Sequence, residues 1–190
     1  FCMAMDFDRL LRRGIPGLID DIKERKAQIG KKGGDECFLD GLLIMLDVFK
    51  DTCLHYRKQA EALAKNAKSA KDRKRLKETA STLEAITVRA PQTFREAVQL
   101  LWLYLIMGSG KHIEPGRLDI FLGDFYANDI DSGVITEAAA MDVILALWAV
   151  INENGEPAVS RVVLGGKGRR NEKNADRFAM AALEAIRRFR

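Results

Sequence analysis

Residues 91–107 read PQTFREAVQLLWLYLIM and predict a helix that is apolar on nearly every side. Thr93 and Glu96 have the spacing of a capping box, and Pro91 precedes them. From residue 97 to residue 107, Gln99 is the only strongly polar side chain. A helix that is hydrophobic all round needs neighbours on every side, so this segment is expected in the interior of the fold.

A second helix of this kind is predicted after Thr136, where only Asp142 interrupts the apolar run from Met141 to Ile151. Neither helix reaches the roughly twenty residues needed to cross a bilayer, so both are expected to be buried helices of a protein without membrane contact. The other helices of this 190-residue chain are mostly of the surface type. We therefore expect further sequence or a partner chain to cover the two apolar helices.

Amphipathic spacing predicts the remaining elements. A first helix begins near Phe7 and is expected to bend or split near Gly14 and Pro16. Further helices are expected at 35–66, around 76–86, at 120–128 and at 175–190. One strand is expected near residues 160–165, and one strand cannot form a sheet by itself. Because Phe1 is not an initiator Met and the last helix has no stop signal, residues 1–190 are expected to be a partial domain, truncated at both ends.

Composition excludes several classes of protein. The net charge of +4 is spread over segments of mixed sign, and the basic stretch 65–77 has no aromatic residue for base stacking, so no nucleic-acid partner is expected. Two histidines and three cysteines without a CxxC spacing predict no metal site and free thiols in a reducing compartment. No signal peptide opens the chain, and the cytoplasm is the expected location.

The loop 108–119 places charged side chains directly after a buried helix, a position that can perturb pKa values and create a site. Lys111, His112, Glu114 and Arg117 are the candidates for substrate contact, and His112 is the first of them because it titrates near neutral pH. The alternative is structural: Arg117 forms an ion pair with Asp119 while Lys111 stays in water.

Residues 165–170 read GGKGRR between the expected strand and the last helix, the outline of an anion-binding turn. Gly166, Gly168 and Arg169 are the candidate ligands of a phosphate, which would suit a phosphate-ligand-binding enzyme. The sequence matches neither a Rossmann nor a Walker motif. The alternative is a tight connection in which Asn171 is the N-cap and Glu172 favours the helix dipole.

Several segments together resemble glycyl radical enzymes of the pyruvate formate-lyase and glycerol dehydratase type. The segments are residues 89–102 (RAPQTFREAVQLLW), 115–119 (PGRLD), Tyr126 with 128–130 (NDI), 145–148 (LALW), the opening 5–14 (MDFDRLLRRG) and 163–166 (VLGG). They follow one another in the family's order along almost the whole chain.

The resemblance implies a mainly α-helical fragment of an α/β barrel, with about one barrel strand near residues 160–165. In the family a glycyl radical and a cysteine meet inside the barrel, and a separate activating enzyme with S-adenosylmethionine and an iron-sulfur cluster installs the radical. Nothing here matches the radical loop, and Cys2, Cys37 and Cys53 lie upstream of the family's cysteine. This chain is therefore expected to hold no catalytic residue and no cofactor, and to be inactive alone.

The resemblance also implies partners: the remainder of the barrel, the activating enzyme, a small organic substrate and, as one possibility, a second copy in a homodimer. In dehydratase-like members the stretch matching 110–117 reads GHSxSxGR, whereas here Lys111 and His112 replace His-Ser and Glu114 replaces Ser. The expected enzyme is thus an anaerobic radical lyase or dehydratase that differs from a polyol dehydratase. A helical protein-interaction module is the alternative from another class.

Overall fold

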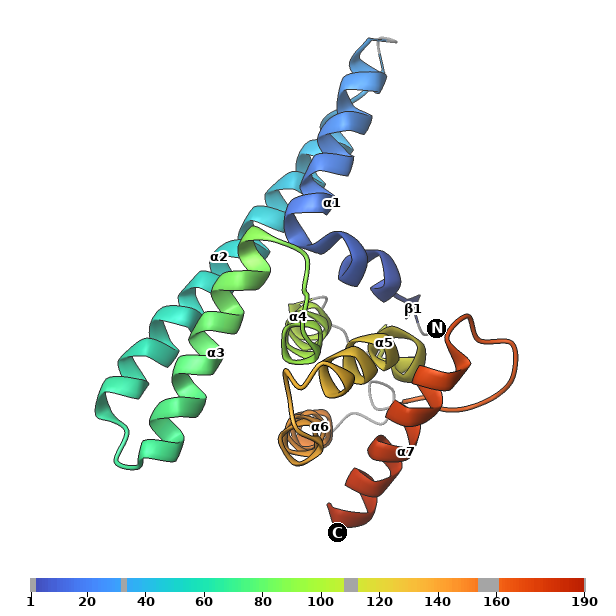
Figure 1. Cartoon of the computed structure of the whole chain (residues 1–190). Helices are drawn as coiled ribbons and strands as arrows, with labels where there is room; N and C mark the ends of the chain where they lie inside the picture. The colour runs from blue at the N-terminus through green and yellow to red at the C-terminus, as the bar shows by residue number, and fades with distance from the viewer. Residues whose placement is uncertain (1–2, 32–33, 108–112, 154–160, 190) are drawn as a thin grey trace. The chain divides into compact units, whose positions relative to one another are not determined.

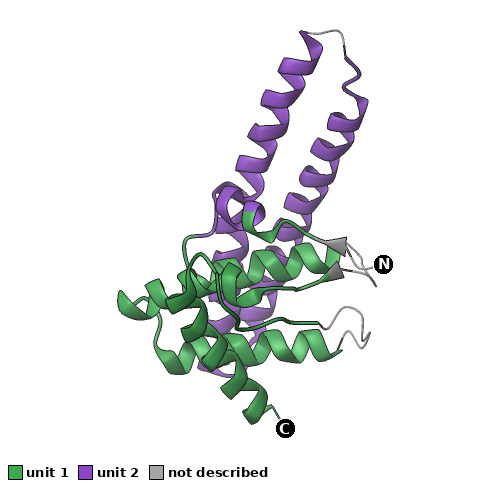
Figure 2. Cartoon of the chain, turned by 90° about the vertical axis from the view of Figure 1, so that its right-hand side faces the viewer, with its two compact units in different colours: residues 1–8, 92–190 green, residues 9–91 purple. Residues whose placement is uncertain are grey.

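The computed structural model describes residues 3–31, 34–107, 113–153 and 161–189, and these residues are mainly helical (Figure 1). In chain order the elements are β1 (Met3–Ala4), α1 (Phe7–Gly30), α2 (Cys37–Asn66), α3 (Ala70–Val88), α4 (Phe94–Met107), β2 (Ile113–Glu114), α5 (Leu118–Asp131), α6 (Glu137–Glu153) and α7 (Glu172–Arg188). The chain divides into two compact units, residues 1–8 with 92–190 and residues 9–91, which Figure 2 distinguishes by colour. Each unit is described by itself.

In the unit of residues 9–91, helix α1 is broken at Gly14, which has φ +62°. A Cβ at this position would lie 2.6 Å from the backbone Cα of Ala90, so glycine is required both by the dihedral angle and by the close approach. The break that the sequence predicted near Gly14 and Pro16 is confirmed.

Helices α2 and α3 form an antiparallel hairpin in the same unit (Figure 1). Ser69 caps α3, because its Oγ accepts the backbone N–H of Asp72 at 3.0 Å. Arg57 of α2 donates to Glu84 of α3 at 2.9 Å. At the other end of α2, Asp40 accepts a 2.5 Å hydrogen bond from Lys26 of α1.

The other unit begins its helical core at α4, where both residues of the predicted capping box form hydrogen bonds at the helix start. The Glu96 backbone N–H donates to Thr93 Oγ1 at 3.3 Å, and the Glu96 carboxylate accepts the Gln92 N–H at 2.8 Å. A third group also caps this helix: Asp129 Oδ2, from α5, accepts the Phe94 N–H at 2.7 Å. The start of α4 is thereby attached to α5.

Three aromatic rings join α4, α5 and α7 in the core of this unit. Phe94, Tyr126 and Phe178 pack edge to face, with ring centroids 5.5 to 5.9 Å apart. Helix α5 also approaches α7 closely at Gly123, where a Cβ would lie 2.8 Å from the Ala175 backbone. The absence of a side chain at Gly123 thus allows the two helices to approach closely.

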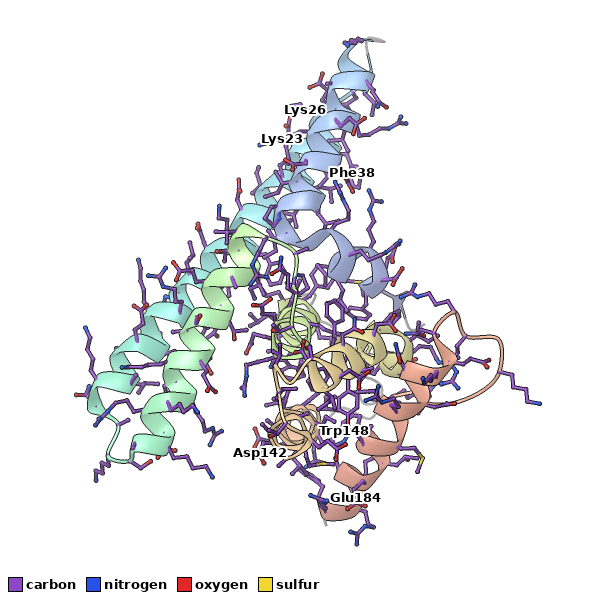
Figure 3. All side chains as sticks on the ribbon, viewed as in Figure 1. Lys23, Lys26, Phe38, Asp142, Trp148 and Glu184 are labelled. Carbon is purple, nitrogen blue, oxygen red and sulfur yellow. The ribbon has the colours of Figure 1, made fainter. Side chains whose placement is uncertain are left out.

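The two tryptophan-bearing helices differ in how far this chain covers them. Trp148 of α6 is buried and donates its indole N–H to the Ala182 carbonyl oxygen of α7 at 3.2 Å, and Asp142 is exposed (Figure 3). Helix α6 therefore finds much of its cover within the chain. On α4, Trp102 keeps partial exposure and Ile106 is exposed.

Extended structure is sparse in the described residues. β1 and β2 pair in parallel, with Met3 opposite Ile113 and Ala4 opposite Glu114. The strand expected near residues 160–165 is not confirmed, because residues 161–165 contribute only one parallel bridge, between Val162 and Gly116. A strand requires a ladder of neighbours, and Gly116 alone does not provide one.

Candidate functional site

The candidate site lies where three parallel-running segments end. The Gly116 N–H donates to the Arg161 carbonyl oxygen at 3.2 Å, and the Val163 N–H donates to the Gly116 oxygen at 2.8 Å. β2, immediately before Gly116, pairs in parallel with β1. Because parallel segments end at the same edge, the residues that follow them come together there.

Asp119 is the centre of this edge. Its side chain is 0% exposed, and its carboxylate accepts from the Gly165 N–H at 2.9 Å and from the Ile120 N–H at 2.9 Å. Arg169 Nη1 donates to Oδ2 at 3.0 Å, and Arg117 Nε donates to Oδ1 at 3.2 Å. A buried carboxylate is stable only when it is paired in this way.

Arg117 adds a second link between the same segments. Its Nη2 donates to the Gly165 carbonyl oxygen at 2.7 Å as well as to Asp119 at 3.3 Å. We refer to Arg117, Asp119, Gly165 and Arg169 as the Asp119 cluster. The cluster holds the turn after β2 against the turn after Val162.

Electrostatics at Asp119 favour the ionised form. Burial alone would raise the pKa of this carboxyl, but the hydrogen bonds from Arg117, the Gly165 N–H and Arg169 together hold the pKa below 3.8. The carboxylate therefore stays charged at neutral pH and keeps the two arginines in place.

The candidate anion ligands contact carboxylates of the protein itself. Arg169, whose side chain is 5% exposed, donates to Asp176 in addition to Asp119. The backbone N–H groups of Gly168 and Arg169 both point to the carboxylate of Glu172. A phosphate at this turn would have to displace the Glu172 carboxylate from these N–H groups. Anion binding by Gly166, Gly168 and Arg169 stays a prediction.

Among the candidates for substrate contact, Glu114 and Arg117 are described by the structure, whereas Lys111 and His112 lie outside the described residues. The Arg117–Asp119 ion pair, one of the two alternatives from sequence, is present. The Glu114 side chain is 22% exposed, and its Oε1 lies 3.5 Å from Arg161 Nη1. No hydrogen bond from the described part of the chain reaches that oxygen, which leaves it able to accept one.

Sequence reasoning missed the long-range partners of this edge. Nothing local marks Arg169 as the partner of Asp119, because the two residues are 50 positions apart. Asn171 occupies the N-cap position of α7 but makes no side-chain cap, and its amide donates instead to the Ile120 carbonyl oxygen at 3.1 Å. The sequence carries one local signal of a buried ion pair: Asp119 is the charged residue within the otherwise apolar stretch 118–122.

The sequence and the fold of the chain are similar to those of known proteins. A family model described as pyruvate formate lyase-like matches residues 2–190. The chain belongs to the pyruvate formate lyase-like family. Among curated relatives of this family member, (2S)-3-sulfopropanediol dehydratase from Klebsiella oxytoca is 26% identical over 96% of the chain and 25% of the relative. Trans-4-hydroxy-L-proline dehydratase from Clostridioides difficile is 24% identical over 82% of the chain and 21% of the relative.

Solved structures of glycyl radical enzymes share the fold of this pyruvate formate lyase-like chain. The glycerol-bound B12-independent glycerol dehydratase from Clostridium butyricum matches 98% of the chain with a TM-score of 0.85 and 25% identity, and 26% of that structure is covered. A glycyl radical enzyme from Archaeoglobus fulgidus matches 99% with a TM-score of 0.82 and 25% identity, and 27% of it is covered. The chain thus spans about a quarter of the length of these relatives.

The described residues lack two other kinds of feature. No helix in these parts of the chain has both the length and the apolar character needed to cross a membrane. The same residues bring together no group of three His, Cys, Asp or Glu side chains suited to a metal ion.

Proposed function

We propose that residues 1–190 are part of the barrel-forming domain of a glycyl radical enzyme that cleaves or eliminates at carbon, as a lyase or a dehydratase. The match of the family model to residues 2–190 carries the proposal. The relatives named above, with their dehydratase names, support the reaction class. In this proposal the remainder of the barrel supplies the radical glycine and the catalytic cysteine, and an activating enzyme with S-adenosylmethionine and an iron-sulfur cluster generates the radical.

The part that this chain plays is to form one side of the substrate site. The Asp119 cluster fixes the turn that follows Glu114, at the edge where parallel segments end. Glu114 presents an oxygen that accepts a hydrogen bond, and an acidic acceptor suits a hydroxyl or ammonium group of a small organic substrate. His112 and Lys111 precede β2 and complete the proposed set with Arg117.

The residue types in the loop argue for a substrate other than a simple polyol. Glu114 and Lys111 are charged residue types in this loop, and charged side chains favour charged or strongly polar groups of a ligand. A substrate that carries both a hydroxyl group and a charged group would match this preference. We place the chain with radical enzymes that act on such substrates.

The proposal is tested on the complete protein, produced anaerobically with its activating enzyme. We expect the doublet of a glycyl radical in electron paramagnetic resonance, and no doublet from the 190-residue chain alone. A folded, complete protein that gives no doublet would refute the radical assignment.

Substrate contact by Glu114 is tested in the same preparation. Glu114→Gln is expected to raise KM by about tenfold or more, since a neutral amide oxygen replaces the carboxylate as the hydrogen-bond acceptor. The doublet should keep its intensity. Glu61→Gln, an exposed change on α2, serves as the control and should leave KM unchanged. Equal KM values in the two variants would remove Glu114 from the site.

A further inference from the structure

Positive charge is concentrated around the turn that joins α2 and α3 in their hairpin (Figure 1). Between residues 62 and 77 the chain has seven basic residues and one acidic residue, Asp72. The net charge of the whole chain is +4, so all other residues together are slightly acidic. We call the seven basic residues, all exposed, the basic tip: Lys65, Lys68, Lys71, Arg73, Lys74, Arg75 and Lys77. An exposed cluster of one sign attracts a partner of the opposite sign.

The protein itself balances little of this charge. Lys74 Nζ lies 3.9 Å from Glu78 Oε1, which is a long ion pair. Arg73 donates to the Ala67 carbonyl oxygen at 3.1 Å. In the described part of the chain, no ion pair engages the other five members of the basic tip. Most of these cations are therefore available to a partner.

The basic tip also lowers the stability of its own helix. Lys71 and Arg73 lie in the first turn of α3, where the helix dipole favours negative charge. Lys71 and Arg75, like Arg73 and Lys77, are four residues apart, a spacing at which like charges repel one another. Residues that oppose the stability of their own element are expected at functional surfaces, where binding determines the residue type.

The arrangement of the cations around α3 favours a flexible partner. Arg73 and Arg75 are two positions apart, which is about 200° around a helix, and Lys71, Lys74 and Lys77 fall between them on the exposed side. A flat membrane surface or a rigid nucleic-acid duplex contacts one side of such a helix. An extended, flexible polyanion can follow the charges around it.

The residue types favour an acidic polypeptide over a single nucleic-acid strand. Single strands are held by aromatic side chains on which the bases stack, and residues 57–93 contain no Phe, Tyr or Trp. Five of the seven cations are lysines. A lysine ammonium on its flexible stem adapts to carboxylates that have no fixed geometry.

We propose that the basic tip binds an extended segment of another protein that is rich in Asp and Glu. The segment follows the turn between α2 and α3 and forms several exposed ion pairs, each of them weak. Because exposed charges are screened by salt, the affinity of this contact depends on ionic strength. The surface adds a protein partner to the chain and is independent of the radical chemistry proposed above.

The test uses the complete protein without its activating enzyme, so the outcome does not depend on radical formation. Fluorescence anisotropy follows the binding of a fluorescein-labelled polyglutamate peptide. We expect binding at an ionic strength of about 0.15 M, and an affinity on the order of tenfold higher at about 0.01 M, where the Debye length is about 30 Å instead of about 8 Å. Absence of binding, or an affinity that does not change with salt, would overturn the proposal.

Charge reversal locates the contact. A triple variant with Lys68→Glu, Lys71→Glu and Lys77→Glu should weaken peptide binding by at least about tenfold. Its helical circular dichroism signal should be unchanged. Its melting temperature should not fall, because an acidic residue at position 71 favours the start of α3.

The matched control reverses three exposed charges elsewhere in the same unit: Lys23→Glu, Arg25→Glu and Lys31→Glu. Its affinity for the peptide at about 0.15 M should stay within about twofold of the original, since distant charges are screened. Equal losses in the two triple variants would show that net charge, and not the basic tip, holds the peptide.

Two further probes distinguish the class of partner. A DNA duplex and vesicles of anionic phospholipid should each bind the original protein more weakly than polyglutamate at about 0.15 M ionic strength. Tighter binding of either probe, lost in the variant of the basic tip, would replace the acidic segment with a nucleic acid or a membrane and overturn the proposal.

Discussion

Asp119 Oδ2 and Arg169 Nη1 lie 3.0 Å apart, although 50 residues separate them in the chain. Both side chains are buried, and the Gly165 N–H donates to the same oxygen. One carboxylate thus connects the turn after β2 with the turn after Val162.

Asp119→Asn should destabilise the unit formed by residues 1–8 and 92–190. The change leaves Arg117 without its counter-charge and Arg169 with Asp176 alone, and removal of one partner from a buried pair costs about 3 kcal/mol of unfolding free energy. Urea unfolding followed by tryptophan fluorescence measures it, because Trp102 and Trp148 both lie in this unit. Asp131→Asn, which breaks an exposed ion pair with Arg177, is the control and should reduce the free energy of unfolding much less. Equal reductions in the two variants would contradict the central role of Asp119.

The contribution of Asp129 to the free energy of unfolding should fall as pH rises, whereas that of Asp119 should fall as pH is lowered. Burial raises the pKa of Asp129, and the nearby Glu96 carboxylate raises it further. The hydrogen bond from the Phe94 N–H lowers this pKa but does not offset the rise. Its contribution to stability is therefore complete below 3.8, the unfolded value, and is lost as pH rises through the higher folded pKa. The stability advantage of the original chain over Asp129→Asn should be larger at pH 4 than at pH 7. A constant difference in urea unfolding at the two pH values would contradict this.

Asp119 should stabilise the folded unit above pH 3.8, its unfolded pKa. This stabilisation should be lost as pH falls through the lower pKa of the folded state. The original chain and Asp119→Asn should then converge in stability at acid pH. The same urea series provides the measurement, and a difference that widens on acidification would refute the assignment.

Gly123→Ala should destabilise the contact between α5 and α7. The new Cβ would lie 2.8 Å from the Cα and N atoms of Ala175, and backbone cannot move aside as a side chain does. Overpacking of this kind costs about 1–3 kcal/mol. In thermal unfolding, the melting temperature should fall for Gly123→Ala and fall further for Gly123→Val. An unchanged melting temperature in both variants would contradict the close packing of α5 against α7.

Cys53 should resist thiol reagents in the native chain. It is fully buried, and this burial raises the pKa of its thiol to about 11, so the reactive thiolate is scarce. A chain with Cys2→Ser and Cys37→Ser should react only after denaturation. The matched variant with Cys2→Ser and Cys53→Ser should react at once through exposed Cys37. Equal native rates in the two variants would contradict the buried position.

Sequence alone predicted the features that depend on neighbours in the chain. The capping box at Thr93 and Glu96 and the break at Gly14 are local, because propensity and backbone dihedrals decide them. The predicted helices of α2 and α6 also follow from short-range periodicity.

Features that depend on distant partners could not be predicted in this way. The strand near 160–165 has the β-branched residues of a strand, yet among the described residues Val162 forms a bridge with Gly116 alone. Pairing partners decide whether such residues form a ladder, and sequence periodicity does not report them. Arg169, which the sequence suggested as an anion ligand, forms ion pairs with Asp119 and Asp176. That pairing depends on folding, which brings residues 119 and 169 together.

The separation of Asp119 from Arg169 also orders events during protein synthesis. The ribosome makes the carboxylate first, and Gly165 and Arg169 emerge only after another 46 and 50 residues. Until then α5 cannot complete its charged anchor, whatever the state of α4 and α6. Folding of this unit on the ribosome therefore finishes late, when α7 leaves the exit tunnel, and a translational pause before residue 165 would prolong the unanchored state.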